Sequence, residues 1–281
     1  MTVDGYSTEF LAELLGTARR AAAAGAAVLA TRDGARLGQE TKSSGSDWVT
    51  EFDVAAELAV REVLGAERPH DIVTGEEQGT TRASEPSGFR WSIDPLDGTT
   101  NFIRDIVYYA TSVAVADASG RWLAGVVHAP ALRREYWAGR GSGAFRSDDG
   151  GAPRQLDGPV PGRDAAGSAI IATGFSYDPA IRRDQARFLP QLMDGFGDMR
   201  RLGSAALDLC LVADGTHDAY GERGLNEHDF AAGALIAEEA GCWVRRPQLT
   251  SPLDGGPSDA ERLASWTCAG GIEFSGRFPL L

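Results

Sequence analysis

The 281-residue sequence predicts a mixed α/β fold. Two stretches near the N-terminus repeat apolar residues at helical spacing, and a series of short apolar runs bounded by Gly, Pro or Asp follows them. Beyond residue 164 the predicted strands and helices alternate, which is typical of α/β folds. Hydrophobic residues make up 43% of the chain and charged residues 24%, so we expect one globular domain, residues 1–281, with an N-terminal half of about 1–150 and a C-terminal half of about 151–281.

The N-terminal half is expected to contain two helices followed by a largely antiparallel sheet. The first thirty residues predict one helix, because Leu11, Leu14 and Ala18 recur at helical spacing. A second helix should begin at Thr50, since Thr50-x-x-Asp53 has the form of a capping box, and it should end before Pro69. The expected strands are residues 72–74, 89–93, 110–116, 122–128 and 134–137. A stretch rich in Gly, Asp and Pro, residues 141–164, is interpreted as the connection between the halves.

The C-terminal half is expected to alternate strands with helices. We predict strands at residues 169–173, 218–220 and 242–244, and helices near 183–193, at 204–213 and at 226–240. Gly241 is well placed to end the last helix. Residues 250–259 are expected to form a loop.

The charge balance excludes some classes of partner. A formal net charge of −13 and a pI near 4.8 leave no basic surface for nucleic acid or for an anionic membrane. A phosphate substrate would need bound divalent cations to reverse the local sign. Three widely spaced cysteines indicate a reducing compartment, and the alanine-rich run 21–30 is too short and weakly apolar for a membrane span. We therefore expect a cytoplasmic protein.

Carboxylates follow predicted strands or begin predicted helices at several points. Glu76 follows one strand, Asp94 and Asp97 follow another, and Asp229 lies in the first turn of a helix. Magnesium prefers carboxylate and carbonyl oxygens, and the Leu96 carbonyl lies between the two aspartates. The local sequence leaves alternatives open: Asp229, like the capping-box aspartate, fits a purely capping role, and Glu76 fits a solvated turn.

The segment Asp94-Pro95-Leu96-Asp97-Gly98-Thr99 combines two functions. Pro95 fixes one backbone angle and Gly98 permits close approach, so the two carboxylates should be presented rigidly. The amides that follow Gly98 could open a helix and receive a phosphate group. Metal ligands next to an anion site are the combination that phosphoryl transfer requires.

These residues resemble the inositol monophosphatase family, within the superfamily of lithium-sensitive, magnesium-dependent sugar phosphatases. The matching motifs are Lys42–Ser44, Asp47–Asp53, Gly75–Glu77, Asp94–Phe102, Leu202–Ala206 and Ala219–Gly241. The resemblance implies a layered α+β sandwich of alternating helix and sheet layers, a homodimer, two or three Mg²⁺ ions per site, and inhibition by millimolar lithium.

The resemblance also implies a role for each site residue. Metal ligation falls to Glu76, Asp94, the Leu96 carbonyl, Asp97 and Asp229, with Asp94 bridging two ions. Asp53 and Thr99, together with Glu76, would position and deprotonate the attacking water. The Gly98 and Thr99 amides would hold the phosphate, and the alcohol part of the substrate would face Asp97, Gly203, Ser204, Ala205 and Glu222. Lys42, the one lysine among 27 basic residues, is a candidate active-loop residue, with an ordinary surface lysine as the alternative.

Two departures from the family pattern stand out. His228 precedes Asp229 where the family commonly has Trp, which alters an aromatic wall against the substrate. Residues 103–108 replace a usual Gly and Pro, which changes the local loop and affects a possible subunit contact.

The function expected from this sequence is magnesium-dependent hydrolysis of a small phosphomonoester, with inositol 1-phosphate as the first choice. Histidinol phosphate, fructose 1,6-bisphosphate and 3'(2'),5'-bisphosphate nucleotides are alternative substrates, because relatives with similar metal motifs handle them. A non-catalytic regulatory protein on the same fold is the alternative of another class. The complete carboxylate set and the negative net charge count against it.

Overall fold

The structure, a computed structural model, describes residues 2–32, 40–41, 48–163, 167–247 and 259–278. The helices are α1 (Thr8–Leu29), α2 (Glu51–Glu67), α3 (Thr99–Ile103), α4 (Pro179–Ala186), α5 (Leu189–Met193), α6 (Ala205–Ala213), α7 (Glu227–Glu239), α8 (Asp259–Ala264) and the 3₁₀ turn η1 (Ile272–Phe274). The strands are β1 (Thr2–Val3), β2 (Tyr6–Ser7), β3 (Glu40–Thr41), β4 (Trp48–Val49), β5 (Ile72–Gly75), β6 (Gly79–Thr81), β7 (Arg90–Asp97), β8 (Ala110–Ala116), β9 (Trp122–Ala129), β10 (Arg134–Gly139), β11 (Gly143–Asp148), β12 (Arg154–Leu156), β13 (Ile170–Ala172), β14 (Asp198–Arg200), β15 (Ala219–Arg223), β16 (Trp243–Arg245) and β17 (Trp266–Gly270).

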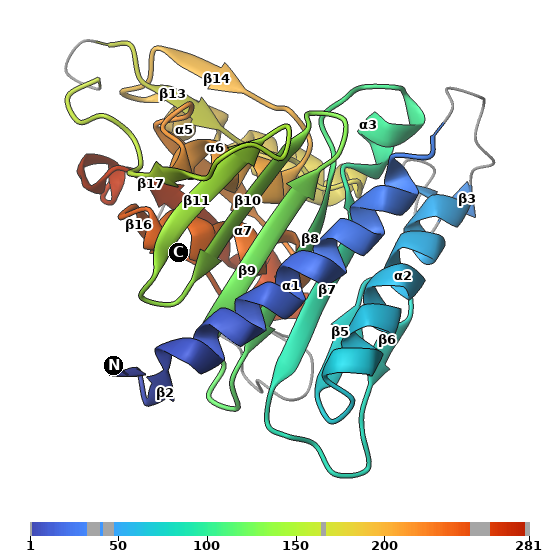
Figure 1. Ribbon diagram of the computed structural model, residues 1–281. Coiled ribbons are helices and arrows are strands. Elements are labelled where there is room, and N and C mark those ends of the chain that lie inside the picture. The colour runs from blue at the N-terminus through green and yellow to red at the C-terminus, as the bar shows by residue number, and fades with distance from the viewer. Residues whose placement is uncertain (1, 33–39, 42–47, 164–166, 248–258, 279–281) are drawn as a thin grey trace.

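Helix and sheet layers alternate through the molecule (Figure 1). Helices α1 and α2 cover one face of an eight-stranded sheet with the order β12-β11-β10-β9-β8-β7-β5-β6, in which the β5–β7 pair is parallel and the other pairs are antiparallel. Helices α6 and α7 fill the space between its other face and a five-stranded sheet with the order β14-β13-β15-β17-β16. Helix α5 and η1 contribute Leu192 and Phe274 to a cluster on the second sheet. The layered fold class that the sequence predicts is confirmed.

The two N-terminal helices form where the sequence predicts them. Ser7 caps α1 by accepting a hydrogen bond from the Phe10 amide, and Thr50 caps α2. Small residues let α1 lie close to its neighbours: a Cβ added at Gly25 would come within 2.8 Å of Thr111 and 2.9 Å of Val60. Among the described residues, no helix combines the length and the apolar character needed to cross a bilayer.

Several predicted boundaries are wrong. Residues 141–164 contain β11 and β12, which extend the large sheet through antiparallel pairing with β10. The Gly and Asp residues of this stretch form hairpin turns, for example at Gly141 and Asp149, both with positive φ. The single helix expected near 183–193 is two helices, because Pro190 lacks an amide hydrogen and stands in the first turn of α5. Strand β17 was not predicted, and nearly all of the loop expected at 250–259 lies outside the described residues.

A buried ion pair joins the large sheet to the middle helix layer. The Arg90 side chain of β7 is fully buried, and its guanidinium donates to both carboxylate oxygens of Glu227 in α7, with Nη2 2.9 Å from Oε2. Arg90 lies four residues before Asp94, and Glu227 lies two residues before Asp229. The pair therefore fixes the strand that carries two predicted metal ligands against the helix that carries a third.

We expect Glu227→Gln to lower the free energy of unfolding by about 3–5 kcal/mol, because the Arg90 charge would stay buried without a compensating carboxylate. Urea denaturation measures the loss. Asp149→Asn is the matched control, since the Arg133–Asp149 pair is mostly exposed and should contribute about 0–1 kcal/mol. Equal losses in the two variants would contradict the stabilising role of the buried pair.

Candidate active site

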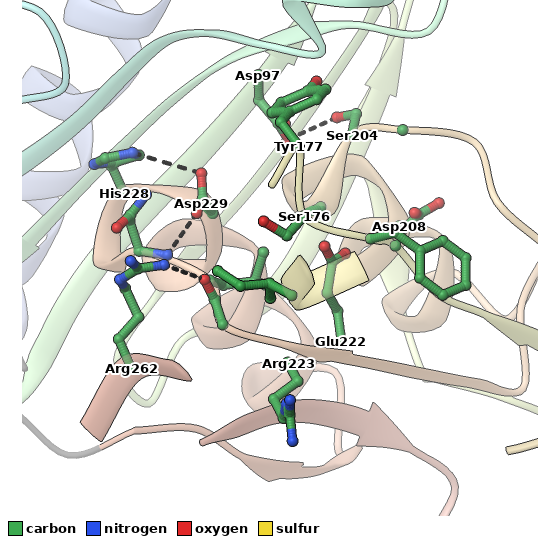
Figure 2. A pocket seen from close by; sticks show the side chains of 18 of the residues that line it. Asp97, Ser176, Tyr177, Ser204, Asp208, Glu222, Arg223, His228, Asp229 and Arg262 are labelled. Atoms are coloured by element: carbon green, nitrogen blue, oxygen red, sulfur yellow. Dashed lines mark hydrogen bonds and ion pairs between the residues drawn. The ribbon is translucent and has the colours of Figure 1, made fainter. Parts of the chain in front are cut away.

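Acidic side chains from separate elements meet at a polar cleft of about 580 Å³ (Figure 2). Glu76 follows β5, Asp97 ends β7, and Asp229 lies in the first turn of α7; all three line the cleft. Asp94 is nearly buried beside them. Three potential ligand atoms, one each from Glu76, Asp94 and His228, lie within 4.8 Å of one another. The structure thus brings together the four carboxylates that the sequence predicts as metal ligands.

An irregularity in β7 presents two of these carboxylates. The register of β7 against β8 shifts between Asp94 and Asp97, where Pro95 and Leu96 stand. The Leu96 amide donates to Asp94 Oδ1 at 3.1 Å, and the Thr111 hydroxyl donates to the Pro95 carbonyl at 2.9 Å. Bulges often redirect side chains next to active sites. The expected end of this strand at Ile93 is therefore wrong by four residues, because pairing resumes beyond the bulge.

Asp97 also interacts with the start of α6. Its Oδ2 accepts hydrogen bonds from the Ser204 hydroxyl and the Ala206 amide, both at 2.7 Å. Burial, helped by the Asp229 and Glu76 charges and opposed by the two hydrogen bonds, raises the pKa of Asp97 to about 7. Ser204, predicted to face the substrate, thus also holds a predicted metal ligand.

Asp53 and Asp229 each cap a helix, as their alternative interpretations predict, yet both also face the site. Asp53 Oδ2 accepts from the Thr50 amide at 2.8 Å, while Asp53 Oδ1 lies 3.2 Å from the Thr99 hydroxyl oxygen. Asp229 Oδ2 accepts from the Asn226 amide at 2.6 Å, while Oδ1 lies 3.5 Å from His228 Nε2. One oxygen of each carboxylate thus holds the helix, and the other contacts Thr99 in the case of Asp53 and His228 in the case of Asp229.

The donor set fits a hard divalent cation. Burial raises the pKa of Asp229, and the Glu76 charge raises it further, while the proximity of His228 lowers it. Carboxylates that repel one another in this way are stabilised when a cation binds between them. Carboxylate oxygens and a backbone carbonyl are the ligands that Mg²⁺ prefers.

A buried glutamate that the sequence analysis did not single out supports the loop that carries Glu76. Glu57 of α2 is fully buried, and its carboxylate accepts hydrogen bonds from the amides of Glu77 at 2.7 Å and Gln78 at 3.1 Å. A Cβ added at Gly75 would lie 2.1 Å from Glu57 Oε1, so a glycine is required there. The signal in the sequence is a glutamate four residues after Asp53 on the same helix. The amide that it binds belongs to Glu77, 20 positions further along the chain, so no local pattern connects the two residues.

One predicted substrate-facing residue, Glu222, comes from the second sheet. Glu222 of β15 lines the cleft, and Tyr220 donates a hydrogen bond to Glu222 Oε2 at 2.8 Å. Burial raises the pKa of Glu222 to about 7. A Cβ at Gly174 would lie 1.9 Å from Glu222 Oε2, so the backbone closes directly over this carboxylate.

The structure describes the remaining predicted positions, with one exception. Gly203 and Ala205 line the cleft next to Ser204, whereas Gly98, with φ +96°, begins α3. Lys42 lies outside the described residues. Asp208, which is not among the predicted site residues, lines the cleft and accepts a hydrogen bond from the Tyr108 hydroxyl at 2.8 Å. An acidic residue between Leu207 and Leu209, inside an otherwise apolar helix, is the signal that could have revealed it.

We expect Glu57→Gln to loosen the Glu76 loop, because the amide group that replaces one carboxylate oxygen would face the backbone N–H donors. Amide hydrogen exchange at Glu77 and Gln78 should accelerate, and Mg²⁺ affinity measured by calorimetry should fall by about 10-fold or more. Glu62→Gln, an exposed substitution on the same helix, should change neither quantity. Unchanged exchange in the Glu57 variant would show that the loop is held by other contacts.

Comparison with known proteins places the chain in a family. A sequence model described as the inositol monophosphatase family matches residues 11–265. The inositol-1-monophosphatase SuhB of Mycobacterium tuberculosis is 41% identical over 218 residues, covering 76% of this chain and 73% of that protein. The Nus factor SuhB of Pasteurella multocida is 38% identical over 204 residues, covering 72% and 73%. The crystal structure of the extragenic suppressor protein SuhB from Bartonella henselae has a TM-score of 0.78 and 31% identity, covering 93% and 95%. The chain, which carries an acidic cleft on the same fold, belongs to the inositol monophosphatase family of phosphatases.

Proposed function

We propose that this protein is a magnesium-dependent phosphomonoesterase that hydrolyses a small polyol or sugar monophosphate, with inositol 1-phosphate as the preferred substrate. The observation that carries the proposal is the meeting of Glu76, Asp94, Asp97 and Asp229 at a polar cleft beside the Thr99–Asp53 pair. Membership of the family supports phosphatase chemistry.

Five groups would hold two or three Mg²⁺ ions: the Glu76, Asp94, Asp97 and Asp229 carboxylates and the Leu96 carbonyl. Bound ions of this kind supply an activated water and stabilise charge on the leaving oxygen. Asp94 would contribute a carboxylate that is 2% exposed and whose ligand atom lies within 4.8 Å of one from Glu76. Without cations, the net charge of −13 would repel a phosphate ester.

Thr99 and Asp53 are placed to orient the attacking water. The Thr99 hydroxyl has one hydrogen and lies 3.2 Å from Asp53 Oδ1 and 3.1 Å from the Leu96 carbonyl. When that hydrogen is donated to Asp53, the lone pairs of Oγ1 accept a hydrogen bond from water. Asp53 and Glu76 then serve as proton acceptors. The Gly98 and Thr99 amides at the start of α3 hold the phosphate oxygens.

The lining of the cleft suits an alcohol with several hydroxyl groups. Glu222 and Asp208 supply carboxylates, and Ser176, Tyr177 and Asn226 add neutral polar groups. The hydroxyl groups of a polyol both donate and accept hydrogen bonds, so they can pair with these side chains. A cationic amino alcohol such as histidinol phosphate would also suit a carboxylate. Phosphate release measured on inositol, histidinol, fructose and nucleotide phosphates distinguishes these substrates. Comparable rates on nucleotide bisphosphates would count against a polyol monophosphate.

The second candidate function is a regulatory role on the same fold. It is favoured by the relative of 38% identity that carries the name of a Nus factor. The acidic surface and the assembled carboxylates favour catalysis, and magnesium-dependent turnover of any small phosphate ester would distinguish the two. The proposed phosphatase function includes four further expectations: a cytoplasmic location, a homodimer, inhibition by lithium, and a single domain with two halves.

We expect Asp94→Asn to reduce phosphate release to background while the protein stays folded, because the amide removes a buried carboxylate charge from the proposed metal ligands. Activity with Mg²⁺ and thermal unfolding of the same sample measure both effects. Asp198→Asn removes an exposed carboxylate of β14 and should leave activity unchanged. Retained turnover in the Asp94 variant would contradict the assignment.

We expect Glu222→Gln to lower kcat/KM for inositol 1-phosphate by roughly 10-fold, the size of one charged hydrogen bond to a hydroxyl. Hydrolysis of p-nitrophenyl phosphate should change little, since that substrate has no ring hydroxyls. An equal loss on both substrates would show that Glu222 supports the metal site and does not select the alcohol.

A further inference from the structure

We propose that His228 is itself a metal ligand, so that one cation position is held by Glu76, Asp94 and an imidazole nitrogen. This inference rests on the proposed metal-dependent function and concerns the chemistry of the cation. Imidazole suits later first-row ions, whereas an all-oxygen set suits Mg²⁺. The position should therefore favour an ion such as Co²⁺ or Zn²⁺ more strongly than a carboxylate-only site would.

The ring nitrogen lies within reach of the predicted ligands. His228 Nε2 is 3.9 Å from Glu76 Oε2 and 3.5 Å from Asp229 Oδ1, and its group with Glu76 and Asp94 fits within 4.8 Å. Ligand atoms about 2.1 Å from a shared ion lie up to about 4.2 Å apart. A group that fits within 4.8 Å therefore has to contract only slightly to enclose one ion. Figure 2 shows the imidazole directed at Asp229 beside the cleft.

The backbone around His228 is fixed on both sides. Glu227, the preceding residue, is held by the buried Arg90, and Asp229, the following residue, accepts a hydrogen bond from the Asn226 amide. The His228 side chain is 17% exposed and its Nε2 atom is buried. The ring is thus presented to the carboxylates by the ion pair that joins β7 to α7, and such preorganisation is what a ligand position requires.

If His228 instead acted only as a positive charge beside the carboxylates, its removal would have the opposite effect on cation affinity. An imidazolium that only neutralises the carboxylates would compete with a cation for them. Removing it would then leave cation affinity unchanged or higher. Removing a ligand lowers the affinity, most strongly for ions that prefer nitrogen.

Calorimetric titration with Co²⁺ and Mg²⁺ distinguishes these roles in the wild-type protein, His228→Gln and the control His70→Gln, which changes an exposed histidine. We expect His228→Gln to lose about 10-fold or more in Co²⁺ affinity and less than about twofold in Mg²⁺ affinity. The visible absorption bands of bound Co²⁺ should shift in that variant alone. Equal or higher Co²⁺ affinity in His228→Gln, with an unchanged spectrum, would overturn the proposal.

A second measurement does not depend on a variant that folds. Pulsed electron paramagnetic resonance of Mn²⁺ bound to the wild-type protein should show coupling to a nitrogen nucleus, and the coupling should change when histidine is labelled with ¹⁵N. Bound Mn²⁺ without histidine coupling would overturn the role of His228 and leave the proposed phosphatase function standing. A wild-type protein that binds none of these cations would contradict both.

Discussion

The buried ion pair between Arg90 and Glu227 determines how the rest of the site is assembled. Two charges can remain in a protein interior only when their geometry and hydrogen bonding are good, so the pair tolerates little change in the distance between β7 and α7. Asp94 and Asp97 continue the same strand, and Asp229 continues the same helix. The cluster therefore depends on a contact between two residues that do not line the cleft.

Three helix N-termini contribute to the site. Asp53, Asp97 and Asp229 each accept a hydrogen bond from a backbone amide or hydroxyl at the start of α2, α6 or α7. The partial positive charge of a helix N-terminus stabilises carboxylates there and also favours an anionic ligand. In a chain with a net charge of −13, these helix ends, together with bound cations, supply the local positive potential that a phosphate ester requires.

Local signals in the sequence predicted more of this structure than non-local ones could. The capping box at Thr50 and the helices α1, α6 and α7 are encoded by neighbouring residues, and the carboxylates could be grouped because they follow strands or begin helices. The sequence predicts a connection where β11 and β12 stand, because hairpin turns and linkers use the same Gly and Asp residues. The contact of Glu57 with the Glu77 amide and the Arg90–Glu227 pair join residues 20 and 137 positions apart, which no local pattern reveals.

His228 shows how one substitution can change two properties of a site together. The resemblance to the family marks this position by its departure from Trp, and the sequence analysis linked that change to the wall against the substrate. The structure places the ring among Glu76, Asp94 and Asp229 as well as on the cleft. An apolar wall and a nitrogen donor cannot occupy the same position. If the imidazole binds the cation, the space beside the substrate and the chemistry of the metal position are set by the same side chain, so neither can be altered without the other.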